Sequence, residues 1–235
     1  MNVSGIDVMI LAGGLGSRLK SSVADRQKVV AAVDGRPFLF YLLEQLKNIQ
    51  VNKLIFCTGH MQETVVQALK NYTDGGKILF SYEDTPLGTG GAVRQAVALA
   101  EAPDVLVMNG DSFINCDLTA FCAAYYKNDR QGLMLLTEVD DVSRFGMVTL
   151  DENSRITSFC EKGAFRGQGL INAGVYLFPK RILESIPAGC LFSLEKQFFP
   201  ELVKAGTLYG FSVNGDFIDI GTAESYNQAQ RFFKQ

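Results

Sequence analysis

The sequence predicts an α/β domain whose mixed, mainly parallel sheet is flanked by helices and is followed by an α+β elaboration in its second half. Up to about residue 130, short apolar runs with β-branched residues alternate with amphipathic stretches, as in parallel strands covered by helices on both faces. Beyond residue 130, strand-like segments follow one another with few helices between them. No stretch resembles a flexible linker, so we expect residues 1–235 to form a single domain.

In the first half, strands and helices alternate in a doubly wound, Rossmann-like order. The first strand is expected at residues 7–12, and a glycine-rich turn follows it. We then expect, in order, a helix at 38–48, a strand at 53–58, a helix at 62–71, a strand at 77–83, a helix at 91–100 and a strand at 104–109. This last strand ends at the polar triplet Asn109, Gly110 and Asp111.

In the second half, strands predominate. They are expected at 132–139, 146–151, 155–162 and 171–178, followed by helices at 179–185 and 194–205. Short strands at 207–213 and 217–220 and a closing helix at 223–233 complete the chain. The absence of an internal repeat or low-complexity tract indicates that this half elaborates the same domain.

Composition excludes several classes of partner. With 22 Lys+Arg against 25 Asp+Glu, the chain has no broad basic field that would attract nucleic acid or an anionic membrane. No apolar run approaches the roughly 20 residues needed to span a bilayer, so we expect a cytoplasmic protein. The five cysteines form no C-x-x-C pair and His60 is the single histidine, which argues against a zinc site.

The turn after the first strand, LAGGLGSRL at residues 11–19, is suited to binding phosphate, because backbone amides of a tight glycine turn can converge on phosphate oxygens. It is not a P-loop, and Leu19 occupies the third glycine position of the dinucleotide-binding fingerprint. Arg18 and, further on, Lys28 add positive charge that could converge on a triphosphate. The alternative is a glycine turn that only packs a helix close to the sheet.

This loop resembles the signature loop of the sugar-phosphate nucleotidyltransferase family. Further motifs resemble that family in the expected order: PLGTGGA at 86–92, Asn109-Gly110-Asp111, Glu161-Lys162, Asn172-Ala173-Gly174 and Asp219-Ile220-Gly221-Thr222. The resemblance covers about residues 7 to 230. It implies the nucleotide-diphospho-sugar transferase fold, with residues 1–130 binding the nucleotide and residues 131–235 the sugar phosphate.

Within the family, DRQKV at 25–29, DDVSRFG at 140–146 and GLIN at 169–172 are most similar to D-glycero-α-D-manno-heptose 1-phosphate guanylyltransferases. The chain departs from the wider family at Gln27 and Val29, which replace prolines, and at Lys20, which replaces another proline. Lys28 is retained between the first two.

The resemblance implies Mg²⁺-dependent attack by a sugar 1-phosphate oxygen on the α-phosphorus of a nucleoside triphosphate, GTP in this subfamily. The product is a nucleotide sugar used in cell-surface polysaccharide synthesis, and pyrophosphate leaves in line. Because the sugar phosphate is already an anion, the site needs cations rather than a general base. His60, after a strand end, is accordingly expected in a turn or cap.

Site roles follow from the same resemblance. Catalysis is assigned to Arg18, Lys28 and Asp111, and the metal to Asp111 and Asp219, since paired carboxylates suit magnesium. Nucleotide contacts are assigned to Leu11, Gly13, Gly14, Gly16, Ser17, Glu83, Gly88 and Thr89. Sugar phosphate contacts are assigned to Gly146, Glu161, Lys162, Asn172 and Gly174. Guanine presents N–H donors on one edge, so an acceptor is expected, with Glu83 or Asp84 as candidates.

Three alternatives remain open at this point. A dinucleotide-dependent oxidoreductase would need an acidic residue at the end of the second strand, but Asp34 lies instead before Gly35 in a turn. A nucleotide-sugar-binding subunit without activity would be marked by the loss of a charged site residue, and none is lost. A different substrate pair, either UTP with an amino-sugar phosphate or GTP with mannose 1-phosphate, would keep the mechanism. The sequence indicates no oligomeric state.

Overall fold

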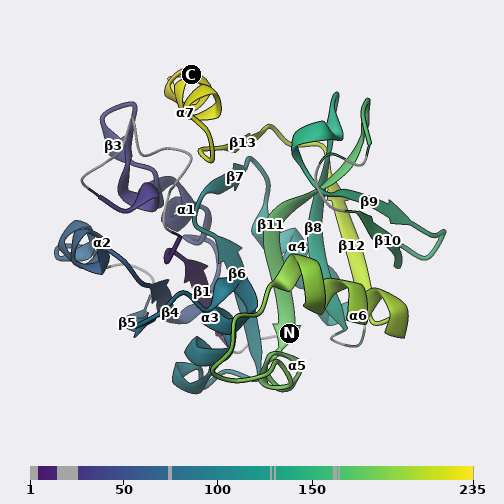
Figure 1. The fold of residues 1–235 in the computed structure, drawn as a ribbon, viewed down its shortest axis with the longest axis horizontal. Coiled ribbons are helices and arrows are strands. Elements are labelled where there is room, and N and C mark those ends of the chain that lie inside the picture. Colours follow the sequence, from purple (N-terminus) through teal and green to yellow (C-terminus); the bar gives the residue numbers. More distant parts are fainter. Residues whose placement is uncertain are drawn as a thin grey trace.

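The fold is seen in a computed structural model that describes residues 5–14, 26–73, 76–127, 129, 131–160, 163 and 165–234. Its main feature is a nine-stranded sheet (Figure 1). Along its main path the strand order is β10-β9-β11-β6-β1-β4-β5; in addition, β8 pairs with β11, and β12 pairs with β8. The sheet therefore runs through both halves of the sequence.

The first half contributes four parallel strands: β1 (Ile6–Leu11), β4 (Val51–Thr58), β5 (Lys77–Tyr82) and β6 (Asp104–Asn109). Strand β1 lies between β4 and β6 and is buried on both faces, which is why its sequence IDVMIL is almost wholly apolar. The connecting helices are α1 (Leu39–Gln45), α2 (Gln62–Leu69) and α3 (Gly88–Ala96), with a 3₁₀ turn at Val97–Leu99. This arrangement confirms the expected parallel, helix-flanked sheet.

In the second half, β11 (Gly169–Pro179) runs antiparallel to β6 and joins the two halves. The other strands are β8 (Gly132–Val139), β9 (Met147–Leu150), β10 (Ile156–Cys160) and β12 (Leu208–Val213). The helices are α5 (Lys180–Glu184), a π-helical turn (Leu194–Phe198), α6 (Phe199–Ala205) and α7 (Ala223–Phe232). These elements agree with the expected ones to within a few residues, except that 194–205 is divided in two, with a proline in the first turn of α6.

Three strands and one α-helix were not expected, and neither were the short 3₁₀ helices at Lys28–Val30 and Val142–Arg144. Strands β2 (Ala32–Val33), β3 (Arg36–Pro37) and β7 (Ser112–Ile114) have only two or three residues, too few for a periodic pattern. Helix α4 (Leu118–Lys127) is long enough, and its buried residues Leu118, Phe121, Cys122 and Tyr125 recur at helical spacing. The sequence therefore contained the signal for α4, and our prediction missed it.

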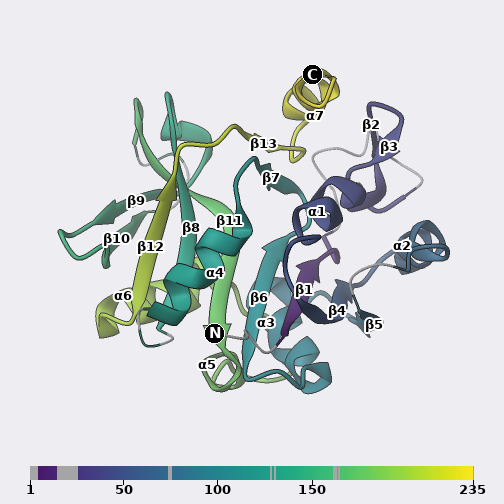
Figure 2. The same ribbon diagram turned by 180° about the vertical axis from the view of Figure 1, so that it is seen from behind.

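Two hydrophobic clusters cover the two faces of the sheet. In the first cluster, Val8 and Ile10 of β1 lie with residues of α1, α2 and α4. Met9 of β1 points to the other face and belongs to the second cluster, with residues of α3, α5 and α6. Figure 1 shows α3, α5 and α6 in front of the sheet. Figure 2 gives the opposite view, in which α1 and α4 lie in front of the sheet. No helix in the described ranges is long and apolar enough to cross a membrane.

Candidate functional site

The predicted nucleotide loops meet at one edge of the sheet, because parallel strands bring their carboxyl ends together. Leu11 ends β1, and its carbonyl oxygen accepts a hydrogen bond from Gly110 N at 3.0 Å. A Cβ at Gly110 would lie 2.3 Å from that oxygen, so only glycine allows this approach. On the other side of β1, Ala12 N donates to Cys57 O at 2.8 Å. The turn after β1 thus starts between β4 and the segment that carries Asp111.

Glu83 lies directly beside the start of the glycine turn. A Cβ added to Gly13 would come within 2.7 Å of Glu83 Oε1, whereas one added to Gly14 would meet nothing within 4 Å. The other carboxylate oxygen, Oε2, accepts a hydrogen bond from Leu87 N at 2.8 Å. Burial raises the pKa of the half-buried Glu83 carboxyl. An acceptor is therefore positioned between the phosphate loop and the expected base loop.

The expected base loop is hydrogen-bonded to the segment that precedes the π-helical turn. Gly88 adopts φ +72°, and a Cβ there would lie 2.7 Å from Phe192 O. The same carbonyl oxygen accepts hydrogen bonds from Gly90 N at 2.9 Å and Gly91 N at 3.1 Å. These bonds explain why α3 begins at Gly88 rather than at Gly91, where we expected it. Thr89 Oγ1 donates to Glu195 Oε2 at 2.7 Å.

Lys28 and Asp111 form an ion pair, so the structure brings together two of the three residues assigned to catalysis. The Lys28 side chain is 18% exposed and that of Asp111 40% exposed, which leaves the pair open to a ligand. Gln27 N donates to Thr64 Oγ1 at 3.1 Å, a bond that the family's proline could not make. Val29 is buried in the core. The two departures around Lys28 are thus accommodated by local contacts.

Asp219 is brought to Asp111 by a short ribbon in which β13 (Phe217–Asp219) pairs antiparallel with β7. Directly after β13, Ile220 N donates to the backbone oxygen of Asp111 at 2.9 Å. Asp219 Oδ1 accepts from Gly221 N at 2.7 Å and from Ser225 Oγ at 2.9 Å. These bonds fix the orientation of the second carboxylate.

Each of these carboxylates has a cationic partner: Lys28 for Asp111 and Arg144 for Asp219, with 3.1 Å between Arg144 Nη2 and Asp219 Oδ2. Among the residues that the structure describes, no three His, Cys, Asp or Glu side chains cluster around one point. Two carboxylates suit Mg²⁺ better than Zn²⁺, because Mg²⁺ takes one or two carboxylates and completes its shell with water and substrate phosphates. The donor set therefore fits a magnesium ion that binds together with a substrate.

Two of the predicted sugar-binding residues, Asn172 and Gly174, lie where β11 is irregular. The pairing of β11 with β8 shifts between Asn172 and Tyr176, and Gly174 within the shift has φ +80°. A Cβ at Gly174 would lie 2.5 Å from Ser112 Oγ. Asn172 Oδ1 accepts from Gly174 N at 2.9 Å, and Asn172 Nδ2 donates to the Tyr176 hydroxyl at 2.8 Å. This bulge positions Asn172 and brings Gly174 against the segment that follows Asp111.

Gly146 precedes β9, and a Cβ there would lie 3.0 Å from Cys160 O at the end of β10. Gly146 is therefore next to the strand that leads to the Glu161-Lys162 motif. Five of the assigned residues lie outside the described ranges: Gly16, Ser17, Arg18, Glu161 and Lys162. Their roles stay predictions.

Sequence reasoning missed several polar residues at this site. Arg144 holds Asp219, as described above. The buried Tyr176 receives hydrogen bonds from Asn172 and Asn109. Glu195 contacts Thr89. Periodicity placed Tyr176 in a core strand and Glu195 in a helix, and gave neither residue a functional signal.

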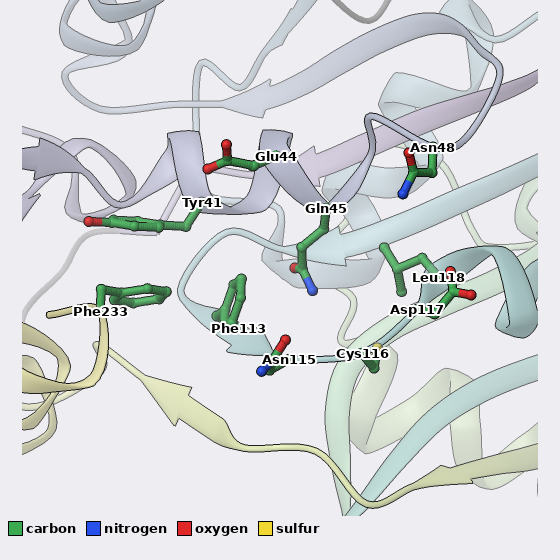
Figure 3. A pocket seen from close by; sticks show the side chains of 10 residues that line it. All are labelled: Tyr41, Glu44, Gln45, Asn48, Phe113, Asn115, Cys116, Asp117, Leu118 and Phe233. Carbon is green, nitrogen blue, oxygen red and sulfur yellow. The ribbon is translucent and has the colours of Figure 1, made fainter. Parts of the chain in front are cut away.

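A separate pocket of about 410 Å³ lies on the outer side of β7 (Figure 3). Its rings include Tyr41 and Phe233, which stack with 3.8 Å between centroids, and Phe113, which meets Phe233 edge-on at 4.9 Å. The pocket is lined by Tyr41, Glu44, Gln45, Asn48, Phe113, Asn115, Cys116, Asp117, Leu118 and Phe233. None of these residues is among the predicted site residues.

A doubly wound sheet whose carboxyl edge carries the start of a glycine turn, two carboxylates and an adjacent lysine is typical of α/β proteins that bind phosphorylated nucleotides. The family model described as "Nucleotidyl transferase" matches residues 7–235, and the chain belongs to this family. The expected family resemblance is thereby confirmed.

The chain is similar over nearly its full length to proteins named D-glycero-alpha-D-manno-heptose 1-phosphate guanylyltransferase. It is 33% identical to the one from Aneurinibacillus thermoaerophilus, covering 96% of this chain and 97% of that protein. It is 35% identical to the one from Campylobacter jejuni, covering 94% and 97%. The crystal structure of HddC from Yersinia pseudotuberculosis in complex with GMP-PN superposes with a TM-score of 0.85 at 36% identity, covering 97% of this chain and 100% of that one.

Proposed function

We propose that this protein is an enzyme that transfers GMP from GTP to D-glycero-α-D-manno-heptose 1-phosphate, releasing pyrophosphate. The observation that carries the proposal is the meeting of Lys28, Asp111 and Asp219 at the sheet edge, next to the start of the glycine turn. Similarity to proteins named for this activity, over at least 94% of the chain, supports the choice of substrates.

On the nucleotide side, the amides after Gly13 and the side chain of Arg18 bind the β- and γ-phosphates in this proposal. Lys28 then neutralises charge at the α-phosphate as pyrophosphate leaves. Glu83 accepts hydrogen bonds from the N1–H and N2–H₂ groups of guanine. Its position 2.7 Å from where a Gly13 Cβ would lie supports this assignment, because the base and the phosphates belong to one ligand.

On the sugar side, Lys162 binds the sugar phosphate, while Glu161 and Asn172 bind hydroxyl groups. Asn172 is held by its own bonds to Gly174 N and to Tyr176, so its orientation is fixed before a sugar arrives. A sugar 1-phosphate held in this way can attack the α-phosphorus directly, and no covalent enzyme intermediate is needed.

Asp111 and Asp219 are proposed to bind Mg²⁺. When bound there, the ion would supply positive charge that stabilises the negative charge developing on the phosphate groups. Their ion pairs with Lys28 and Arg144 support the proposal, because both carboxylates are already placed where they hold a positive charge.

We further propose that residues up to about 130 bind the nucleotide and residues 131–235 the sugar phosphate, within one domain. The continuous sheet supports the single domain. A cytoplasmic location is proposed from the nature of the substrates. The second candidate pair is GTP with mannose 1-phosphate, favoured by 30% identity to a mannose-1-phosphate guanylyltransferase of Mycobacterium tuberculosis.

The test is pyrophosphate release by the purified protein with Mg²⁺. The four ribonucleoside triphosphates and dTTP are each combined with heptose, mannose, glucose, N-acetylglucosamine and N-acetylmuramic acid 1-phosphates. Turnover confined to GTP with the heptose phosphate, and abolished by EDTA, is expected. Turnover with another pair would keep the mechanism and refute the substrates. No turnover with any pair, while a nucleotide sugar still binds, would indicate the binding subunit.

A further inference from the structure

We propose that Glu195 is a sugar-positioning residue whose carboxylate accepts hydrogen bonds from hydroxyl groups of the sugar 1-phosphate while its Thr89 contact joins the sugar site to the nucleotide loop. This inference rests on the proposed function and deepens it. No motif pointed to Glu195, which lies in the π-helical turn between α5 and α6.

The first support is the way in which Glu195 is held. Oε2 accepts two hydroxyl hydrogen bonds, from Thr89 at 2.7 Å and from Ser193 at 2.9 Å. Thr89 is itself fixed, because its Oγ1 accepts from Leu194 N at 2.9 Å. Oε1 accepts no hydrogen bond from any residue in the described ranges. A half-buried carboxylate with one oxygen fully engaged and the other available is suited to a ligand rich in hydroxyl groups.

The second support is where the carboxylate lies. Phe199 follows Glu195 by four residues, so both lie on one side of the helical segment. The Phe199 ring meets the Tyr176 ring with centroids 4.8 Å apart, which places this side of the segment against β11. The Tyr176 hydroxyl in turn receives the hydrogen bond from Asn172, a predicted sugar contact. Glu195 thus lies on the wall of the sugar site.

Electrostatics agrees with this placement. The pKa of Tyr176 is raised well above its usual value, first by burial and next by the negative charge of Glu195, with a smaller contribution from Asp111. Both carboxylates therefore lie near one buried hydroxyl, Asp111 from the metal side and Glu195 from the base-loop side. A sugar phosphate bound between them would meet acceptors on both sides.

The contact with Thr89 joins the sugar site to the nucleotide loop. Thr89 is the second residue of α3, directly after Gly88 in the loop expected to contact the base. Because the Thr89–Glu195 and Leu194–Thr89 bonds form without a ligand, the orientation of Glu195 is set by the same loop that is expected to bind the nucleotide.

The test compares Glu195→Gln with wild type and with Glu201→Gln, an exposed residue of α6 that undergoes the same change of charge. The glutamine amide oxygen still accepts from Thr89 and Ser193, but an N–H₂ donor replaces the second acceptor oxygen. We expect the KM for the sugar 1-phosphate to rise about ten-fold, the KM for GTP to stay within about two-fold and the Tm to stay near that of wild type. Glu201→Gln is expected to match wild type in all three.

An unchanged KM for the sugar phosphate in Glu195→Gln, or equal rises in both KM values, would refute the proposal. Should that variant fail to fold, Thr89→Val supplies the second test. Loss of the Thr89 hydroxyl loosens Glu195, so the KM for the sugar phosphate is expected to rise about three-fold, and a rise confined to GTP would contradict the idea. Wild type is assayed first: if it turns over no sugar phosphate, the proposed function fails, independently of Glu195.

Discussion

The two halves of the sheet present polar groups by different means. At the carboxyl edge of β1, β4, β5 and β6, the polar groups directly follow the strand ends: Gly13 and Gly110 allow close approach of the backbone, and Glu83 and Asp111 come next along the chain. On β11, by contrast, a bulge orients a side chain, because Asn172 is hydrogen-bonded to Gly174 N and to the Tyr176 hydroxyl. The difference follows from strand direction, because parallel strands end together whereas an antiparallel strand passes through the site. The proposed nucleotide side thus depends on glycine, and the proposed sugar side on strand irregularity.

The largest expected effect is on kcat, and it comes from changing Asp111, which lies where the two halves of the sheet meet. Asp111→Asn removes a charge that pairs with Lys28, and we expect kcat to fall about a thousand-fold, the scale of losing a charged group that acts on a phosphoryl transition state. Pyrophosphate release measures it. Asp117→Asn, which alters a carboxylate that caps Thr119 N instead, should leave kcat unchanged. An Asp111→Asn enzyme within ten-fold of wild type would show that this carboxylate is dispensable.

The second largest expected effect is on the free energy of unfolding, and it comes from changing Gly174 in the bulge of β11. Gly174→Ala forces an L-residue to φ +80° and directs a Cβ at Ser112 Oγ, so we expect a loss of about 3 kcal/mol in the free energy of unfolding. Gly189 is the matched control, since it has φ +70° but nothing within 4 Å of a built Cβ. Gly189→Ala should lose only about 1 kcal/mol, from backbone strain alone. Equal losses in denaturant unfolding would mean that packing at the bulge contributes nothing.

Glu83→Gln addresses base recognition in the nucleotide half. The amide would place a donor opposite the N–H groups of guanine, so we expect kcat/KM for GTP to fall about thirty-fold with little change for ATP. Asp84→Asn, an exposed neighbour, serves as the control. Full preference for GTP in Glu83→Gln would exclude Glu83 as the residue that reads the base.

The smallest effect is on pH dependence. Burial raises the pKa of Glu83 above 4.5, so this group protonates at a higher pH than an exposed glutamate. The KM for GTP should therefore begin to rise, as the pH falls, while exposed carboxylates are still ionised. Because the folded pKa exceeds the unfolded one, the contribution of Glu83 to stability declines as the pH rises through its folded pKa. If the KM for GTP depended on pH in the same way in Glu83→Gln as in wild type, this account would be contradicted.

The nucleotide half could be predicted from the sequence largely because its signals are local. An apolar strand followed by glycines predicts both a strand of the sheet and a phosphate turn, and the structure confirms the strand, which ends at Leu11. The sugar half depends on contacts between distant segments. The sequences of residues 112–114 and 217–219 contain no signal that predicts their pairing, yet this ribbon brings Asp219 to Asp111. Likewise, Glu195 is held by Thr89 of α3, which lies 106 residues earlier in the chain, so no local window of sequence could indicate this contact.

The ribbon between β7 and β13 pairs an early segment of the chain with a late one, so this part of the site is completed late in synthesis. Asp219 is added about a hundred residues after Asp111, which at roughly 5–20 residues per second takes on the order of 5–20 seconds. Throughout that interval, the growing chain carries its phosphate turn, its base loop and the first carboxylate, but not the second. Each ribosome-bound chain thus passes through a period in which it has the nucleotide loops without the complete carboxylate pair.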